Sequence, residues 1–410
     1  MRRRIVPVLL AALLAGCSQR QSVQVTVKNP AGFHRSGEMV EVPVDEVFGR
    51  LQLADTAQIV IYNEKAEEVP YQLTYDEKIV FPVEVDSCGE SRYLLQEGEP
   101  ATVNTVVFGR QYPQRMDDIA WENDKSGYRL YGQPLLDTGA QLYGYDIFTK
   151  SVLDLVLEDR YALELDSLSW VRINALRAAG KQAEADSLLR TISYHVDHGT
   201  GMDVYDVGPT LGAGVAALMD KAGQLIYPKA YQTYEILDNG PLRFTLKLTF
   251  APHPVNADSS VVESRIIQLD KGALLNKTTV CYDYLNEKTA IAAGIVIHQQ
   301  HPDGAVYDEA QGFLAYADST NNARAGHGVI YVGMAFPHPL AAAQVAMFER
   351  PVAGAVGHVL GISDYLPGDA YTYYWGSGWS KAGIRDMEAW TEAVRQTAAQ
   401  VRAPLEIAVR

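Results

Sequence analysis

The stretch from Tyr231 to His298 decides the fold, because it holds five apolar-rich segments separated by short polar turns. The segments are YQTYEILD (231–238), LRFTLKLTF (242–250), SVVESRIIQLD (260–270), LLNKTTVCYDY (274–284) and AIAAGIVIH (290–298). Their β-branched and aromatic content predicts long strands at short spacing. Five further segments continue the series at 313–317, 328–336, 345–349, 358–362 and 371–379. The pattern predicts two large antiparallel sheets packed face to face.

The flanks of this region add a second β unit and some helices. Upstream, segments at 23–27, 58–62, 69–73 and 102–108 predict a small β-sandwich. Good helix formers at 154–160 and 169–192 predict a helical insertion over about residues 151–192. Downstream, Asp386 is placed to cap a helix that runs to about Val401, with one apolar face, and 404–409 predicts a last strand. The apolar face of that helix consists of Met387, Trp390, Val394 and Ala398.

The N-terminus carries the pattern of a bacterial lipoprotein signal. Arg2, Arg3 and Arg4 precede a short apolar run, 5–14, and Leu14-Ala15-Gly16-Cys17 follows as a lipobox. The run is too short for a permanent membrane span. The sequence therefore predicts a signal peptide at 1–16, a lipid on Cys17, and an exported protein attached to a membrane through that lipid alone. An ordinary secretory signal is the alternative.

Composition limits the partners. The formal net charge is −15, which makes the chain a poor candidate for binding nucleic acid. A local cationic pocket for an acidic substrate remains compatible with that charge. Cys88 and Cys281 could pair in an oxidising compartment, but their spacing does not indicate a zinc-thiolate site.

Five segments give the chain a resemblance to a known family. They are 115–124 (RMDDIAWEND), 128–132 (YRLYG), 144–150 (GYDIFTK), 194–203 (YHVDHGTGMD) and 373–379 (YYWGSGW). Together they resemble the DUF4861 family of bacterial, often Bacteroidetes, lipoproteins, whose members tend to occur among systems that degrade uronic-acid glycans. The stretch between Lys150 and Tyr194 is longer than is usual in the family.

The resemblance also carries expectations of architecture. The C-terminal half is similar to the galactose-mutarotase-like supersandwich of mutarotases, some glycoside hydrolases and several polysaccharide lyases. The expected organisation is mostly β, with an N-terminal β-sandwich at 17–110 and a supersandwich domain at 111–410 that contains the helical insertion. A shared fold does not by itself fix function.

The segment from Tyr194 to Asp206 is the densest concentration of reactive groups, and its glycines indicate a loop. The preferred hypothesis is a lyase that cleaves uronic-acid oligosaccharides by β-elimination. Arg115 or Arg129 would neutralise the substrate carboxylate, His195 or His198 would remove the proton, and Tyr194 or Tyr205 would protonate the leaving oxygen. The residues expected to contact substrate are Trp121, Arg129, Lys150, His298 and Trp375.

Several alternatives stay open at this point. A divalent metal, the one cofactor considered, could be held by His195, His198 and Asp203. Otherwise the two histidines stabilise the loop through backbone hydrogen bonds. A glycoside hydrolase would need a pair of carboxylates across a cleft. The candidates for that pair are Asp117, Asp118, Glu122, Asp197 and Asp203. In another class, the chain is a lipoprotein that binds glycans through its aromatic side chains without catalysis.

Overall fold

The computed structural model describes residues 21–319 and 325–410. It confirms a mostly β chain with several antiparallel sheets, a few helices and a C-terminal helix. The expected signal peptide, residues 1–16, and the expected lipidation site Cys17 lie outside the described residues. No helix within the described ranges is long and apolar enough to cross a membrane.

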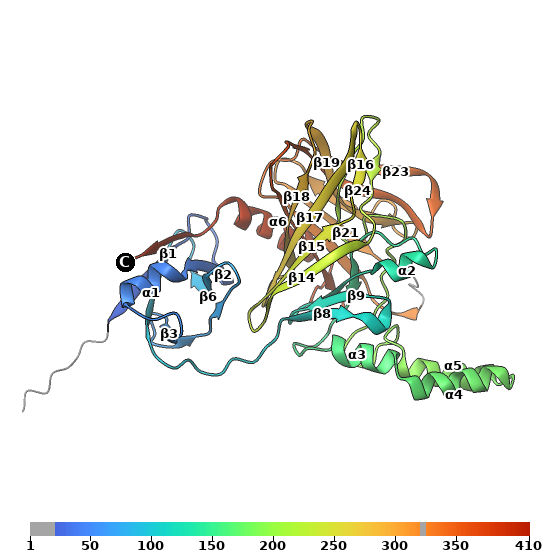
Figure 1. The fold of residues 1–410 in the computed structure, drawn as a ribbon, viewed down its shortest axis with the longest axis horizontal. Coiled ribbons are helices and arrows are strands. Elements are labelled where there is room, and N and C mark those ends of the chain that lie inside the picture. The colour runs from blue at the N-terminus through green and yellow to red at the C-terminus, as the bar shows by residue number, and fades with distance from the viewer. Residues whose placement is uncertain (1–20, 320–324) are drawn as a thin grey trace, which may run out of the picture.

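A small unit of two antiparallel sheets begins the described chain (Figure 1). Strict alternation in β1 places Val23, Val25 and Val27 in its core. The first sheet has the order β26 (Glu406–Val409), β1 (Ser22–Lys28), β7 (Glu90–Glu97), β3 (Ile59–Tyr62) and β4 (Glu68–Val69). The second consists of β2 (Arg35–Pro43), β6 (Lys78–Val85) and β5 (Gln72–Leu73). Helix α1 (Val44–Leu51) connects β2 to β3 along the chain.

Two expectations for this unit need correction. The segment 102–106 is a loop, and the strand expected there begins only at Phe108. The unit is also not made from the N-terminal residues alone, because the last strand, β26, pairs with β1. Figure 1 shows the C-terminal segment running back to β1. A division of the chain at residue 110 therefore omits one strand of the first sheet.

The second half forms the two expected large sheets. In the larger sheet the order is β14 (Tyr231–Asn239), β15 (Arg243–Phe250), β17 (Asp258–Asp270), β18 (Leu275–Asp283), β25 (Tyr371–Trp379), β22 (Ile330–Ala335), β21 (Phe313–Asp318) and β20 (Ala305–Asp308), with β16 (His253–Val255) on β17. The smaller sheet has the order β13 (Leu225–Ile226), β12 (Ala216–Met219), β19 (Thr289–His298), β24 (Ala355–Tyr365) and β23 (Ala342–Val352). Side chains of both sheets share one continuous apolar core, as expected for face-to-face packing.

The opposite, outer face of the larger sheet is covered by helix α6 (Met387–Arg402). Trp390, Val394 and Ala398 are buried against that sheet. The carboxylate of Asp386 accepts a hydrogen bond from the backbone N–H of Ala389, 2.8 Å away, which confirms the expected cap.

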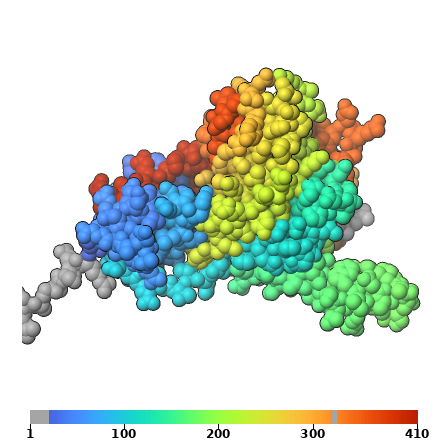
Figure 2. Space-filling model, viewed as in Figure 1, coloured from blue at the N-terminus to red at the C-terminus, as the bar shows by residue number. Residues whose placement is uncertain are grey.

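A four-stranded sheet and a group of helices lie beside the two large sheets. Because it is, after the larger and the smaller sheet, the third sheet that does not belong to the small unit, it is called the third sheet. The sheet has the order β11 (Asp146–Phe148), β10 (Gly127–Leu130), β9 (Asp118–Glu122) and β8 (Phe108–Tyr112). The helices are η1 (Pro113–Arg115), α2 (Gln133–Asp137), α3 (Leu157–Glu164), α4 (Ser167–Ala178) and α5 (Gln182–Ile192). Figure 1 shows α4 and α5 as a hairpin that projects away from the sheets, and in Figure 2 the same green segment forms a protruding lobe.

Candidate functional site

The third sheet brings charged residues together around Arg129. Arg129 on β10 pairs directly with Asp146 on β11, and an isolated bridge from Phe148 to Asp203 adds the loop that follows α5. Asp118 begins the neighbouring strand β9. All four charged side chains are buried. The sheet register therefore gathers one guanidinium and three carboxylates that are far apart in the sequence.

Arg129 has its hydrogen-bonding capacity engaged inside this cluster. Its Nε donates to Oδ2 of Asp146 at 2.9 Å, and its Nη2 donates to Oδ2 of Asp203 at 2.7 Å and to the hydroxyl of Tyr131 at 3.1 Å. Its Nη1 donates to the hydroxyl of Tyr194 at 3.1 Å. Burial alone would lower the pKa of Arg129, but Asp146 and Asp203 raise it well above its ordinary value. The expected substrate contact from Arg129 is thus replaced by contacts inside the protein.

Asp118 is the member of the cluster with the most unusual acidity. Burial, only partly offset by Arg129 and Arg115, raises the pKa of Asp118 to about 6. Its Oδ2 lies 3.9 Å from Nη1 of Arg129 and 4.0 Å from Nη1 of Arg115. Within the described residues its Oδ1 is buried without a hydrogen-bond partner. A carboxyl group in this state exchanges its proton close to neutral pH.

The cluster reaches the protein surface at Tyr194, Arg115 and His195. The hydroxyl of Tyr194 accepts hydrogen bonds from Nε of Arg115 at 3.3 Å and from Arg129. The ring of His195 meets the ring of Tyr194 edge-on, with their centroids 4.8 Å apart. The side chain of His195 is 57% exposed, whereas Tyr194 is buried. Three of the expected catalytic residues therefore meet at one place.

The hydrogen bonds of His195 fix the tautomer of its neutral ring. Nδ1 lies 2.8 Å from the backbone oxygen of Asp203. Because a carbonyl oxygen only accepts, Nδ1 carries the hydrogen, and no group in the described part of the chain occupies the lone pair of Nε2 in the neutral ring. An exposed imidazole held in this way is suited to accept a proton from a bound molecule.

The same loop does not gather the expected metal ligands. Nε2 of His198 lies 3.1 Å from the backbone oxygen of Ser193, so it donates there. Oδ1 of Asp197 accepts from the backbone N–H of Gly199 and Gly201, and Asp203 is bound by Arg129. Within residues 21–319 and 325–410, no group of three His, Cys, Asp or Glu side chains is arranged to hold a metal ion. His198 and Asp197 instead stabilise the loop.

Tyr205 and His298 belong to a second group. Their ring centroids lie 6.1 Å apart, and both side chains are buried. Nδ1 of His298 lies 2.7 Å from Oδ2 of Asp318. Burial alone would lower the pKa of His298, but the bond to Asp318 raises it. Burial also raises the pKa of Tyr205 well above its ordinary value. Among the described residues, no hydrogen bond joins Tyr205 or His298 to His195 or Arg115.

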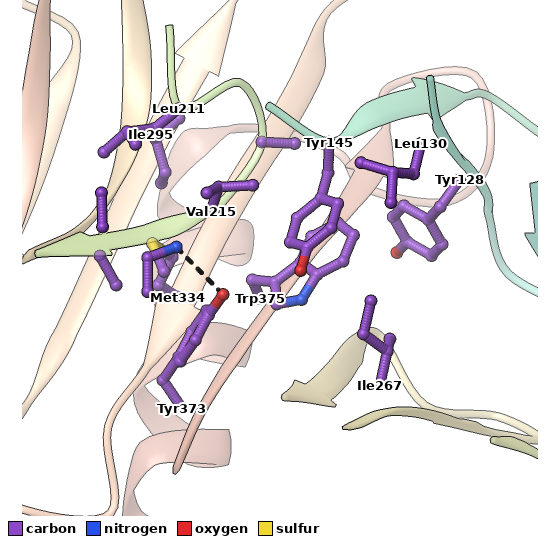
Figure 3. Close-up of a cluster of buried hydrophobic side chains, with 14 of the residues drawn as sticks. Tyr128, Leu130, Tyr145, Leu211, Val215, Ile267, Ile295, Met334, Tyr373 and Trp375 are labelled. Atoms are coloured by element: carbon purple, nitrogen blue, oxygen red, sulfur yellow. Dashed lines mark hydrogen bonds between the residues drawn. The ribbon is translucent and has the colours of Figure 1, made fainter. Parts of the chain in front are cut away.

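Three expected substrate contacts lie in the interior instead. Trp121 and Trp375 are fully buried, and Figure 3 shows Trp375 among packed rings, stacked on Tyr145 with centroids 4.0 Å apart. Alternation on a strand could not tell a core-facing ring from a surface-facing one. Nζ of Lys150 donates to Oε2 of Glu122 at 2.6 Å, and burial lowers the pKa of Lys150. These side chains present no surface to a sugar.

The pair formed by Lys150 and Glu122 has a structural role. Oε1 of Glu122 accepts from the backbone N–H of Val156 and of Leu157, at the start of α3. A buried carboxylate at a helix N-terminus is favoured by the unpaired N–H groups there. Glu122 therefore links the third sheet to the helical insertion, and it is not available as one of a pair of hydrolytic carboxylates.

The sequence did not predict two residues of the charged cluster around Arg129, namely Tyr131 and Asp146. The hydroxyl of Tyr131 donates to Oδ2 of Asp146 at 2.5 Å. The sequence signal was that Tyr131 stands two residues after Arg129, a spacing that would put both on one face if strand β10 continued past Leu130. Between the two cysteines that the structure describes, Cys88 and Cys281, there is no disulfide, and Cys88 is exposed.

The chain belongs to the DUF4861 family, a domain of unknown function, which matches residues 27–407. It is similar to Uncharacterized protein P7 of Formosa agariphila, with 24% identity over 328 residues that cover 75% of each chain.

Two solved structures from Enterococcus faecalis also resemble it. One is an alpha-mannosidase of strain V583 (9% identity, TM-score 0.46) and the other is a protein in glycosyl hydrolase family 38 (8% identity, TM-score 0.45). Each alignment covers 95% of this chain, which spans 46% and 47% of the length of those two proteins.

Proposed function

We propose that the protein is a carbohydrate-active enzyme that cleaves uronic-acid-containing oligosaccharides by β-elimination. The observation that carries the proposal is the meeting of Arg115 and His195 at Tyr194, where a cation, a proton acceptor and a hydroxyl lie together. β-Elimination next to a carboxylate needs these three functions, so the geometry matches the chemistry required.

The roles follow from the contacts of each group. Arg115 is half-buried and has Tyr194 as its hydrogen-bond partner, so its terminal nitrogens can pair with a substrate carboxylate. Nε2 of His195 takes the proton from the carbon next to that carboxylate. The electron pair of the broken C–H bond forms a carbon–carbon double bond as the bond to the leaving oxygen breaks. The hydroxyl of Tyr194 accepts from two guanidinium groups, which leaves its own proton for the leaving oxygen.

The hydrolase alternative has weaker support from the geometry. Asp118 and Asp203 lie around Arg129 in the buried cluster, Glu122 is bound to Lys150, and Asp197 caps backbone groups of its own loop. Within the described residues, four of the five candidate carboxylates are thus engaged with protein partners and only Asp117 is not, whereas a hydrolase needs two that flank a substrate. A glycan-binding lipoprotein without catalysis would use exposed aromatic side chains, and Trp121 and Trp375 are buried.

Ultraviolet absorbance during incubation with pectic, glucuronan and ulvan oligosaccharides tests the proposal. A lyase produces an unsaturated uronate, so absorbance rises with the wild-type chain and not with Arg115→Ala. Saturated products without an absorbance change would establish the hydrolase instead. Binding without any product would establish the non-catalytic alternative, and either result would overturn the lyase proposal.

The location of the protein is a proposal as well. We infer from the lipobox at 14–17 that the chain is exported and lipid-anchored at Cys17, on the periplasmic or cell-surface side of a bacterial membrane. Such an anchor would hold the enzyme where oligosaccharides arrive. Substitution of Cys17 by Ser, followed by membrane fractionation, tests this: the variant should leave the membrane fraction.

A further inference from the structure

A polar cavity lies between the N-terminal unit and the outer face of the larger sheet. It has a volume of about 470 Å³ and is walled by β2, by strands of the larger sheet and by α6. Arg115, Tyr194 and His195 are not among its lining residues. Cavities of this size at the junction of two structural units are common sites for small ligands.

Three polar side chains form a row across the floor of the cavity. Gln268 on β17 pairs with Lys277 on β18, and Lys277 pairs with Tyr374 on β25. All three face away from the sandwich core, since Tyr373 and Trp375 on either side of Tyr374 are buried in it. Adjacent strands are about 4.8 Å apart, so the row extends over roughly 10 Å. That length suits a short oligosaccharide.

These side chains are free to bind a ligand. Within the described residues, the side chains of Gln268, Lys277 and Tyr374 form no hydrogen bond or ion pair, and the same holds for Gln396 and Gln400 on α6 opposite. Burial, together with nearby Asp270 and Glu41, raises the pKa of Tyr374 to about 12, so its hydroxyl stays protonated and can donate. Uncommitted amide, ammonium and hydroxyl groups on two facing walls can contact a molecule rich in hydroxyl groups.

The charge of the cavity favours an anionic ligand. Three carboxylates lie at the cavity: Glu41 and Asp270 share the guanidinium of Arg243, and Glu38 binds Arg35. Lys277 and Lys271 line the same cavity without an ion-pair partner in the described part of the chain. With Arg35 and Arg243 these lysines make four cations against three carboxylates, so the charges at the cavity sum to +1, although the whole chain carries −15.

We propose that this cavity is a second binding site for an acidic oligosaccharide, separate from the Arg115–His195 site. The proposal rests on the proposed function for the class of saccharide, but not on the reaction. A bound carboxylate pairs with Lys277, and the sugar hydroxyl groups contact Gln268, Tyr374 and the amides of α6. Such a site would hold one part of a glycan on the protein while another part reacts at the Arg115–His195 site.

Calorimetric titration of the full chain carrying Arg115→Ala and His195→Ala tests the inference, because that background removes the carboxylate contact and the base of the proposed catalytic site. The probes are tetrasaccharides from pectin, glucuronan and ulvan, with cellotetraose as the neutral control. At least one acidic probe should bind, and cellotetraose should bind more weakly. Adding Lys277→Gln should weaken binding roughly tenfold or more, because it removes a hydrogen bond to a charged group, and adding Tyr374→Phe should weaken it about fivefold, because it removes one to a neutral hydroxyl group.

Lys247→Gln is the matched control. Lys247 is exposed on β15 of the same sheet and does not line the cavity, so its replacement should leave binding unchanged. Absence of binding in the double variant, or binding that neither Lys277→Gln nor Tyr374→Phe weakens in a folded protein, overturns the inference. Loss of binding with these substitutions supports it even if wild type produces no ultraviolet signal, so the two proposals fail separately.

Discussion

The backbone oxygen of Asp203 lies 2.8 Å from Nδ1 of His195, while the carboxylate of the same aspartate binds Arg129 at 2.7 Å. One residue thus connects an exposed imidazole to a buried ion cluster. The lone pair of Nε2 lies at the opposite edge of the ring from this hydrogen bond and has no partner among the described residues. The orientation of His195 therefore depends on Asp203, which is itself held by the buried side chain of Arg129.

If the proposed β-elimination takes place, His195→Ala should reduce its rate by about 100-fold or more, because general bases contribute roughly that much. The fold should be unaffected, since the side chain is 57% exposed. Initial rates from ultraviolet absorbance give the comparison. His198→Ala serves as the control: its ring donates to the backbone oxygen of Ser193 and should matter far less. Equal losses in both variants would contradict the assignment of the base.

Arg129→Met should destabilise the fold strongly. The substitution leaves Asp146 and Asp203 buried near Asp118 without their shared cation. Removal of one partner from a buried ion cluster costs about 3–5 kcal/mol. Urea unfolding followed by circular dichroism measures the change, with half-exposed Arg115→Met as the comparison. A cost below that of Arg115→Met would show that the cluster does not depend on Arg129.

The acidity of Asp118 predicts a pH-dependent stability. Its pKa is about 6 in the folded protein, against 3.8 ordinarily. The folded state therefore binds this proton more tightly than the unfolded chain, and its contribution is full below about pH 4 and lost as the pH rises through about pH 6. A difference of about two pKa units corresponds to roughly 3 kcal/mol.

Asp118→Asn should remove the pH dependence of this contribution, because the amide resembles the protonated carboxyl group and does not titrate. Relative to wild type, the variant should gain roughly 3 kcal/mol in unfolding free energy between about pH 4 and about pH 7. Urea titrations at several pH values measure both proteins. Stability curves that stay parallel across this interval would contradict the prediction.

The sequence was sufficient for the strands of the sandwich but not for the charged cluster. Alternation over β17 and β18 is long enough to predict both strands and their inward faces. The cluster depends on which strands become neighbours: Asp118, Arg129, Asp146 and Asp203 meet only after β9, β10 and β11 pair and the loop before Asp203 folds onto Phe148. The spacing of these four residues along the chain does not predict which strands will pair.

The same limit explains the misplaced aromatic contacts. Tyr374 and Trp375 are neighbours on β25, and the sequence predicts only that they face opposite sides. Which side is covered depends on the second sheet and on α6. The structure buries Trp375 in the sandwich and leaves Tyr374 at the cavity. Trp375 was the more obvious sugar contact by residue type, and its neighbour is the one with access to a ligand.

Trp390→Ala should test how firmly α6 is attached to the larger sheet. Trp390 is fully buried, and its Nε1 donates to the backbone oxygen of Val332 at 3.0 Å. Truncation of a buried tryptophan costs about 3–5 kcal/mol. Trp170→Ala is the control, because Trp170 is half-buried on the projecting hairpin and its loss should hardly affect global unfolding. Similar effects on the main unfolding transition would indicate that α6 contributes little.

Asp386→Ala should destabilise α6 through its first turn. The side chain of Asp386 accepts the hydrogen bond of the Ala389 backbone N–H, and its position favours the positive end of the helix dipole. Loss of such a cap costs about 1 kcal/mol, whereas Asn retains the acceptor. Chemical denaturation of Asp386→Ala and Asp386→Asn should therefore separate them, with Asn close to wild type. If Asn is as destabilising as Ala, the charge of Asp386, and not its hydrogen bond, is what stabilises the helix.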